Sequence, residues 1–344
     1  MAQVRKSRGS SGKRSGASRR GRAASSRKGG VSGGAGKLWR RLVWLVVILL
    51  AVYGGHSGLL RLAPGYSGRV RQAESVIRLA LDKLNSWRSR TVEAVKPLPT
   101  ITIKGPDDLG KTRYDNLSVG VPGWKCDVIL DRAGYALGFS DAWKQPVWVS
   151  YKLTADEVRS KKAKRTDDFR PDPAIPNGSA TLADYRGSRF DRGHLAPAAD
   201  MSWSIQAMSE SFYMSNMSPQ TADCNRGIWK ELETLVREFA IRNKEIYVVT
   251  GPVFLPDRQV ITVGASRVAV PHAYYKVILD MTPPETKAIG FIVPNSGSKK
   301  PLSEFAVTVD AVERATGLDF FNRLDPELEA KLESECDYPA WNRP

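Results

Sequence analysis

One histidine in this sequence has neighbours that suit proton transfer. The chain contains three histidines, which are too few for a metal cluster built from histidine ligands. His194 ends the tetrapeptide Asp-Arg-Gly-His at 191–194, so a carboxylate and a guanidinium lie close to its imidazole along the chain. A neutral imidazole with an ordinary pKa of about 6.5 can take a proton from an attacking water molecule. The tetrapeptide alone could equally form a salt-bridged turn, so its wider context decides.

An amide and a carboxylate stand near the start of a predicted helix downstream. Asn225 marks that start, and Glu233 follows slightly more than two turns later, within about 80° of the same helix face. Mg²⁺ prefers oxygen ligands and keeps several water molecules, so a single Asn carbonyl can serve as its direct ligand. The competing interpretation makes Asn225 a helix N-cap and Glu233 a solvated side chain.

Longer segments around these residues resemble, in the same order, those of the DNA/RNA non-specific endonucleases, the family of the Serratia nuclease and endonuclease G. The resemblance covers roughly residues 111–323. The matching segments are WVSYKLT at 148–154, ADYRGSRFDRGHLAP at 183–197, SNMSPQ at 215–220, NRGIWKELE at 225–233, VVTGPV at 248–253 and VPHAYYKV at 270–277.

The resemblance implies a ββα-metal arrangement, in which two strands carry the histidine and the following helix carries the metal ligand. His194 resembles the general base of the family, and Asn225 resembles its direct Mg²⁺ ligand. Glu233 resembles the carboxylate that reaches the metal through a water molecule. Arg192 resembles the guanidinium near the scissile phosphate, and Asn216 resembles an assisting amide that orients the site.

Two neighbouring assignments follow less directly. Some family members carry a further arginine upstream of the site, and Arg165 and Arg170 are both candidates for it here. Asp191 is interpreted as structural.

The resemblance implies an Mg²⁺-dependent endonuclease that hydrolyses phosphodiester bonds in DNA and RNA, with Mn²⁺ as an alternative ion. A second interpretation is a membrane-tethered nucleic-acid-binding protein, an inactive nuclease homologue acting in DNA uptake or as a scaffold. Such a protein should have lost one of His194, Asn225 and Glu233, yet all three are present. The sequence leaves open a homodimer and an inhibitor protein as partners.

The elements that position these residues are of mixed type. Strands come in pairs without regular alternation with helices, which favours an α+β fold with a mixed or antiparallel sheet. The predicted strands are 128–130, 147–153, 246–249, 267–270, 274–279 and 288–293, and the predicted helices are 227–243 and 301–316.

The positive charge of the chain is concentrated at its N-terminus. Of the formal net charge of +16, thirteen charges come from Lys and Arg within residues 1–41, where Asp and Glu are absent. Residues 1–37 lack the apolar content of a packed core and are predicted to be a disordered basic tail. Residues 38–60 are predicted to form a transmembrane anchor or signal-like segment, and 61–110 a helical stalk with a linker. The endonuclease domain is then expected over 111–344.

The tail also predicts a location. Basic residues remain on the cytoplasmic side of a membrane helix, which would place the nuclease domain outside the cytoplasm, in a bacterial envelope or periplasm. The alternatives are secretion after cleavage and a mitochondrial location, because the tail has the composition of a transit segment.

The three cysteines show no metal-binding spacing. In an oxidising compartment, a disulfide between Cys126 and Cys336 would tie the start of the predicted domain to its end.

Overall fold

The computed structural model of the protein describes residues 99–342. The predicted tail, the predicted membrane or signal-like segment at 38–60 and most of the predicted stalk therefore lie outside the described residues. Within residues 99–342, the helices are too short or too polar to cross a membrane.

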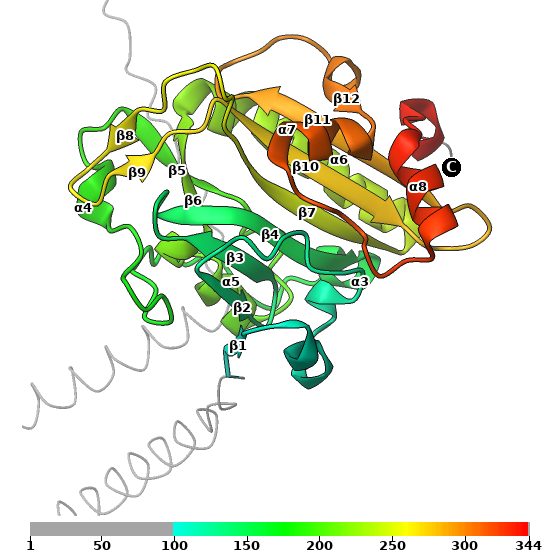
Figure 1. The fold of residues 1–344 in the computed structure, drawn as a ribbon, viewed down its shortest axis with the longest axis horizontal. Helices are drawn as coiled ribbons and strands as arrows, with labels where there is room; N and C mark the ends of the chain where they lie inside the picture. Colours follow the sequence, from blue (N-terminus) through cyan, green and yellow to red (C-terminus); the bar gives the residue numbers. More distant parts are fainter. Residues whose placement is uncertain (1–98, 343–344) are drawn as a thin grey trace, which may run out of the picture. The chain divides into compact units, whose positions relative to one another are not determined.

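The fold is built on one sheet of eight strands in the order β1-β2-β3-β4-β7-β10-β11-β12 (Figure 1). Every neighbouring pair in it is antiparallel, as the pairing of the predicted strands suggested. The strands are β1 (Ile101–Ile103), β2 (Val128–Asp131), β3 (Ala136–Ser140), β4 (Gln145–Thr154), β7 (Glu245–Val253), β10 (Ala273–Asp280), β11 (Lys287–Pro294) and β12 (Ala306–Val307).

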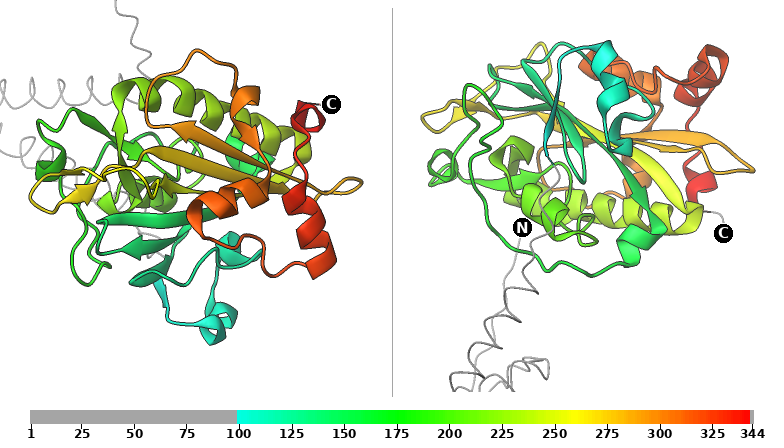
Figure 2. Two further views of the ribbon diagram at one scale, coloured as in Figure 1. Left: turned by 45° about the horizontal axis from the view of Figure 1, so that its top comes forward. Right: turned by 90° about the horizontal axis from the view of Figure 1, so that it is seen from below.

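Helices cover both faces of this sheet. The long helix α6 (Trp229–Asn243) packs on one face, while α7 (Val309–Thr316) and α8 (Pro326–Ser334) lie on the other (Figure 2). In β10, Tyr274 and Ile278 belong to the core under α6, whereas Tyr275 and Val277 belong to the core under α7. Side chains of a strand alternate between its two faces, so burial on both faces explains why the sequence of β10 is apolar apart from Lys276 and the final Asp280.

A separate two-stranded hairpin carries the predicted histidine. It consists of β5 (Phe190–His194) and β6 (Met217–Thr221), which pair antiparallel, and α6 follows them in the chain. This β5-β6-α6 succession is the ββα arrangement that the family resemblance implied. The remaining elements are α3 (Ala155–Arg159), α4 (Leu182–Tyr185), α5 (Ile205–Glu210), the pair β8 (Thr262–Val263) and β9 (Val268–Ala269), and short 3-10 turns.

Two predicted boundaries differ from the structure. The segment before residue 111, predicted to be a linker, already contributes β1 to the sheet, and a 3-10 turn follows at Pro106–Lys111. The region 301–316, predicted as one helix, divides into a 3-10 turn, the edge strand β12 and α7. The division occurs because Ala306 and Val307 pair with β11, which outweighs their helical spacing.

The disulfide between Cys126 and Cys336 that the sequence left open is absent from the structure, where Cys126, Cys224 and Cys336 are free thiols. Cys126 lies before β2 and directs its Sγ toward the carbonyl of Gly123, while Cys336 is exposed after α8. Their sequence positions at the two ends of the domain therefore did not bring them together.

Candidate functional site

The β5-β6 hairpin fixes the tetrapeptide 191–194 against SPQ at 218–220. In its register, Gly193 pairs with Ser218 and His194 pairs with Met217. A side chain at position 193 would overlap Gln220, so glycine is required for this close approach. Two hydrogen bonds anchor the hairpin: Trp229 Nε1 donates to the His194 carbonyl (3.3 Å), and the Tyr274 hydroxyl donates to the Pro219 carbonyl (2.8 Å). The helix and the sheet thereby hold the histidine-bearing strand.

The imidazole of His194 is buried in an aromatic and cationic environment. The residue is only 8% exposed, and its ring meets Phe212 edge-on with 4.9 Å between centroids. Its Nε2 atom is buried and has no hydrogen-bond partner among the described residues. Burial, followed by the positive charges of Arg165 and Arg192, lowers the pKa of His194 to about 3. His194 is therefore neutral at pH 7, but its pKa is not the ordinary value near 6.5 that the sequence suggested.

Arg192 lies directly beside this histidine. Its guanidinium stacks over the ring of Phe169, with Cζ 4.3 Å from the centroid. Its Nε is buried and has no hydrogen-bond partner within residues 99–342. Stacking thus positions the guanidinium, and the part of the chain that the structure describes provides no ion pair that would compete for an anionic ligand.

Asp191 fixes the orientation of the predicted metal ligand. Asn225 Nδ2 donates to Asp191 Oδ2 (2.9 Å), and Arg226 donates to both carboxylate oxygens at 2.8 Å. These contacts lower the pKa of Asp191, with the Arg226 hydrogen bond as the largest cause. An amide that turns its nitrogen toward a carboxylate must turn its oxygen away. Asn225 Oδ1 is therefore the atom presented for other contacts.

Asn225 does not stand at the helix start as predicted. It lies in a π-helical turn, Cys224–Ile228, in which Gly227 departs from helical geometry (φ −104°, ψ −114°), and α6 begins only at Trp229. The N-cap position belongs to Ile228, so the N-cap interpretation of Asn225 is wrong. The 80° separation inferred for Asn225 and Glu233 assumed one continuous helix, and this turn invalidates that arithmetic.

Glu233 lies on α6 above a group of buried charges. The buried Lys276 ammonium lies 4.7 Å from the Trp229 ring centroid, and its Nζ has no hydrogen-bond partner among the described residues. Burial raises the pKa of Glu233 and lowers that of Lys276, while the attraction between the two charges opposes both shifts. Below them, Asp200 accepts hydrogen bonds from Arg237 (3.0 Å) and from the Tyr151 hydroxyl. Glu233 is therefore not the solvated helix residue of the competing interpretation.

Asn216 is enclosed and fully hydrogen-bonded. Its Oδ1 accepts from the amide of Ala196, and its Nδ2 donates to the carbonyls of Ala196 and Ser211, each at 2.9 Å. Its backbone carbonyl also accepts from Leu195. The side chain is 0% exposed, so it holds the loop after His194 and does not reach a substrate. These contacts suit the predicted role of Asn216 as an amide that orients the site, and its part in catalysis stays a prediction.

The two upstream arginines occupy different environments. Arg170 packs over Tyr213 at 4.0 Å and bonds to Asp168 and Ser209, which is a structural arrangement. Arg165 is about half exposed, and its charge acts on both His194 and Glu233. Of the two candidates, Arg165 is the one near the site.

A cavity of about 480 Å³ opens beside these groups. Asp191 and Asn225 contribute to its wall, together with four arginines and three aromatic side chains. These are Arg165, Arg186, Arg192 and Arg226, and Phe169, Tyr185 and Phe190. A cavity with this lining suits a phosphate-bearing chain, because guanidinium groups bind phosphate oxygens and aromatic rings can stack on bases.

The residues present fit an Mg²⁺ ion. Asn225 Oδ1 is a neutral oxygen donor directed away from the carboxylate that orients it. Hard oxygen donors in small number are the ligands that Mg²⁺ takes in proteins.

Sequence reasoning missed three parts of this site. The orienting contact of Asp191, the Phe169 ring under Arg192 and the buried Lys276 were not singled out. Lys276 did carry a signal, because a lone charged residue within an apolar strand must have a buried counter-charge. Phe169 carried no signal, since only tertiary structure brings it to the hairpin.

Comparisons with known proteins agree with this geometry. Residues 113–327 match the model of the DNA/RNA non-specific endonuclease family. Nuclease C1 of Cunninghamella echinulata var. echinulata is 40% identical over 223 residues, which cover 61% of this chain and 88% of that protein. Mitochondrial endonuclease G of Homo sapiens is 36% identical over 213 residues, covering 58% of this chain and 71% of that protein.

The chain matches only part of some relatives. With mitochondrial nuclease EXOG of Mus musculus it is 38% identical over 206 residues, which span 56% of either protein. A solved structure described as an EndoG/EndoGI complex, "Mechanism of EndoG inhibition", aligns with a TM-score of 0.58 and 32% identity over 65% of this chain and 95% of the other.

The family match covers more than half of the chain and includes the whole β5-β6-α6 unit with His194, Asn225 and Glu233. The names of the relatives indicate a nuclease, a hydrolase of phosphodiester bonds. The chain belongs to the DNA/RNA non-specific endonuclease family.

Proposed function

We propose that this protein is an Mg²⁺-dependent endonuclease that cleaves both DNA and RNA. The observation that carries the proposal is that one strand, β5, carries the neutral, buried His194 and also Asp191, which orients the Asn225 amide with its oxygen directed away. Family membership supports the same activity.

The proposed substrate is the sugar-phosphate backbone. Guanidinium groups of Arg186 and Arg192 along the cavity would bind phosphates, and such contacts carry no base-sequence information. Stacking on the cavity's aromatic rings tolerates every base. This lining accounts for a nuclease with little sequence preference.

The proposed roles follow from charge and protonation. His194 Nε2 lacks a partner and stays neutral, so the imidazole can take a proton from a water molecule attacking phosphorus. Arg192 stabilises the charge on the phosphoryl oxygens. Asn225 would hold the Mg²⁺ and Glu233 would act through an intervening water, and the bound ion would supply Lewis-acid stabilisation of that same charge. The buried Lys276 ammonium would attract the Glu233 carboxylate and stabilise its charge.

One experiment distinguishes the proposed nuclease from the alternative, a nucleic-acid-binding protein without catalytic activity. We expect the full chain to bind a labelled DNA duplex in EDTA without cutting it, and to cleave the same duplex once Mg²⁺ replaces the chelator. Anisotropy measures the binding, and gel analysis measures the cleavage. Binding without any cleavage in Mg²⁺ would support the alternative instead.

The fall of kcat/KM at acidic pH should reflect protonation of Glu233 and not of His194. The raised pKa of Glu233 means that this carboxylate is protonated first as pH falls, while His194 stays neutral down to its pKa of about 3. We expect kcat/KM of the wild type to fall between about pH 8 and pH 5. Glu233→Gln should be slower throughout but flat over that range. An acid limb near pH 6 to 6.5 that persists in Glu233→Gln would assign the limb to His194 and contradict this account.

Location and partners remain separate proposals. We propose that residues 38–60 attach the chain to a membrane, with the nuclease domain outside the cytoplasm. Two of the relatives above are named mitochondrial, which matches the alternative location. The complex named in the solved structure gives a reason to propose an inhibitor protein as a partner.

A further inference from the structure

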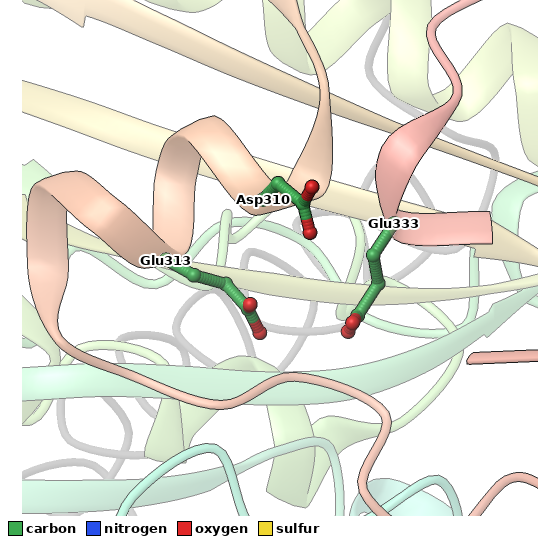
Figure 3. A group of neighbouring side chains, drawn as sticks. All are labelled: Asp310, Glu313 and Glu333. Atoms are coloured by element: carbon green, nitrogen blue, oxygen red, sulfur yellow. The ribbon is translucent and has the colours of Figure 1, made fainter. Parts of the chain in front are cut away.

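Three carboxylates form a cluster on the opposite side of the sheet from the candidate active site. Asp310 and Glu313 lie one turn apart on α7, and Glu333 lies on α8. Their ligand oxygens lie within 4.8 Å of one another. Figure 3 shows the three carboxyl groups converging on one space between the two helices. None of these residues takes part in the phosphodiester chemistry proposed above.

Glu333 has the least favourable environment of the three. It is only 7% exposed, and its Oε1 is buried without a hydrogen-bond partner among the described residues. A buried carboxylate oxygen without a partner is costly and calls for a compensating ion or proton. The picture places this carboxyl group facing those of Asp310 and Glu313.

The electrostatic surroundings of Glu333 are strongly negative. Burial raises its pKa to about 8, and the charges of Glu313, Glu329, Asp319 and Asp310 add to the rise. Among the described residues, one cation is recorded at the cluster: Arg314, 71% exposed, lies 3.9 Å from an Asp310 oxygen. That contact is too long and too solvated to neutralise three carboxylates.

The geometry of Glu313 is fixed before any ligand arrives. Its Oε1 accepts a hydrogen bond from the Phe320 amide (2.8 Å), and its carboxyl group also shares a side-chain hydrogen bond with Glu333. Asp310 and Glu313 are held at a helical spacing, so both present their carboxyl groups on the side of α7 that faces α8.

We propose that Asp310, Glu313 and Glu333 bind a divalent cation of the hard, oxygen-preferring class, and that Ca²⁺ is the ion that fits. Oxygens bound to Ca²⁺ at roughly 2.3–2.6 Å can lie up to about 5 Å apart, whereas those around Mg²⁺ at roughly 2.1 Å lie within about 4.2 Å. The oxygens of this cluster, all within 4.8 Å of one another, lie inside the first of these limits. Ca²⁺ also tolerates irregular geometry and charged ligands, whereas Mg²⁺ demands a near-ideal octahedron.

The bound ion would join α7 to α8. Val309 and Val312 of α7 and Leu332 of α8 already share the core on this face of the sheet, so the cation would close the polar side of the same contact. Its role is stabilising and separate from catalysis, because α6 and the hairpin lie on the other face.

The test uses the full chain with Asn225→Ala, which removes the candidate active-site ligand and leaves one expected cation site. After chelation and dialysis, calorimetry should find one Ca²⁺ per chain, and saturating Ca²⁺ should raise the Tm by about 5 °C. Adding Glu333→Gln should weaken Ca²⁺ binding at least ten-fold and abolish the rise in Tm. Glu329→Gln, on α8 but outside the cluster, serves as the matched control and should change the affinity less than three-fold.

Two outcomes would overturn the proposal. One is the absence of Ca²⁺ binding at millimolar concentration, with Tm unchanged. The other is equal Ca²⁺ binding with and without Glu333→Gln, which would place the ion elsewhere. If Glu333→Gln does not fold, the half-buried Asp310→Asn provides the same comparison. Because binding and Tm are the readouts, the result does not depend on nuclease activity.

Discussion

His194→Ala should reduce kcat for cleavage of a DNA duplex in Mg²⁺ by about 10³- to 10⁴-fold while leaving duplex binding within a few-fold of the wild type. Removal of the imidazole takes away the neutral base, whereas the phosphate-binding arginines of the cavity remain. The bond between Trp229 and His194 uses the histidine's backbone carbonyl, so the alanine variant keeps it. Single-turnover cleavage and anisotropy measure the two effects.

His272→Ala is the matched control for loss of a histidine. His272 accepts a hydrogen bond from the Leu255 amide (3.0 Å) and takes no part in the site. We expect its variant to cleave within a few-fold of the wild type once its folding has been checked by circular dichroism. Comparable losses in the two variants would remove the special role assigned to His194.

Asn225→Ala is expected to abolish Mg²⁺-dependent turnover, with a loss at least as large as that of His194→Ala. The alanine removes the only protein oxygen proposed as a direct ligand. Activity should not return at high Mg²⁺ concentration, because the variant lacks the ligand that positions the ion in the site. Cleavage rates across a Mg²⁺ titration measure this.

Two further variants should lose less activity than Asn225→Ala. Asp191→Ala keeps the Asn225 oxygen but frees the amide to rotate, and Glu233→Gln keeps the shape of the side chain without its charge. Each should cost about 10- to 100-fold in activity or apparent Mg²⁺ affinity, as changes around a metal ligand typically do. If Glu233→Gln were more damaging than Asn225→Ala, the ligand assignment would have to be revised.

The elements of this domain could be predicted where one physical preference dominated. β10 and β11 are apolar on both faces, so their strands were predicted within a residue or two of the observed ends. The stripe of Leu232, Val236 and Phe239 identified α6. β1 was missed because it has only three residues and is defined by pairing with β2, which no local pattern reveals.

The candidate site, like the fold, was predicted from the sequence only in part. His194, Asn225 and Glu233 could be proposed as site residues because their segments keep the family's order along the chain. Their environments could not be found in this way. The depressed pKa of His194 depends on burial and on Arg165, and the orientation of Asn225 depends on Asp191 across a π-helical turn. Such turns and distant neighbours are products of tertiary packing, so residue spacing does not encode them directly.

The central claim, non-specific hydrolysis of the phosphodiester backbone, is tested most directly by giving the full chain DNA and RNA strands of the same base sequence in Mg²⁺. Rates and cut positions are read on a sequencing gel, with the Asn225→Ala variant run in parallel. The account predicts that both strands are cut internally at many positions, at rates within about ten-fold of each other, and that the variant cuts neither. Cleavage confined to one nucleic acid or to one sequence, or equal cleavage by the variant, would contradict it.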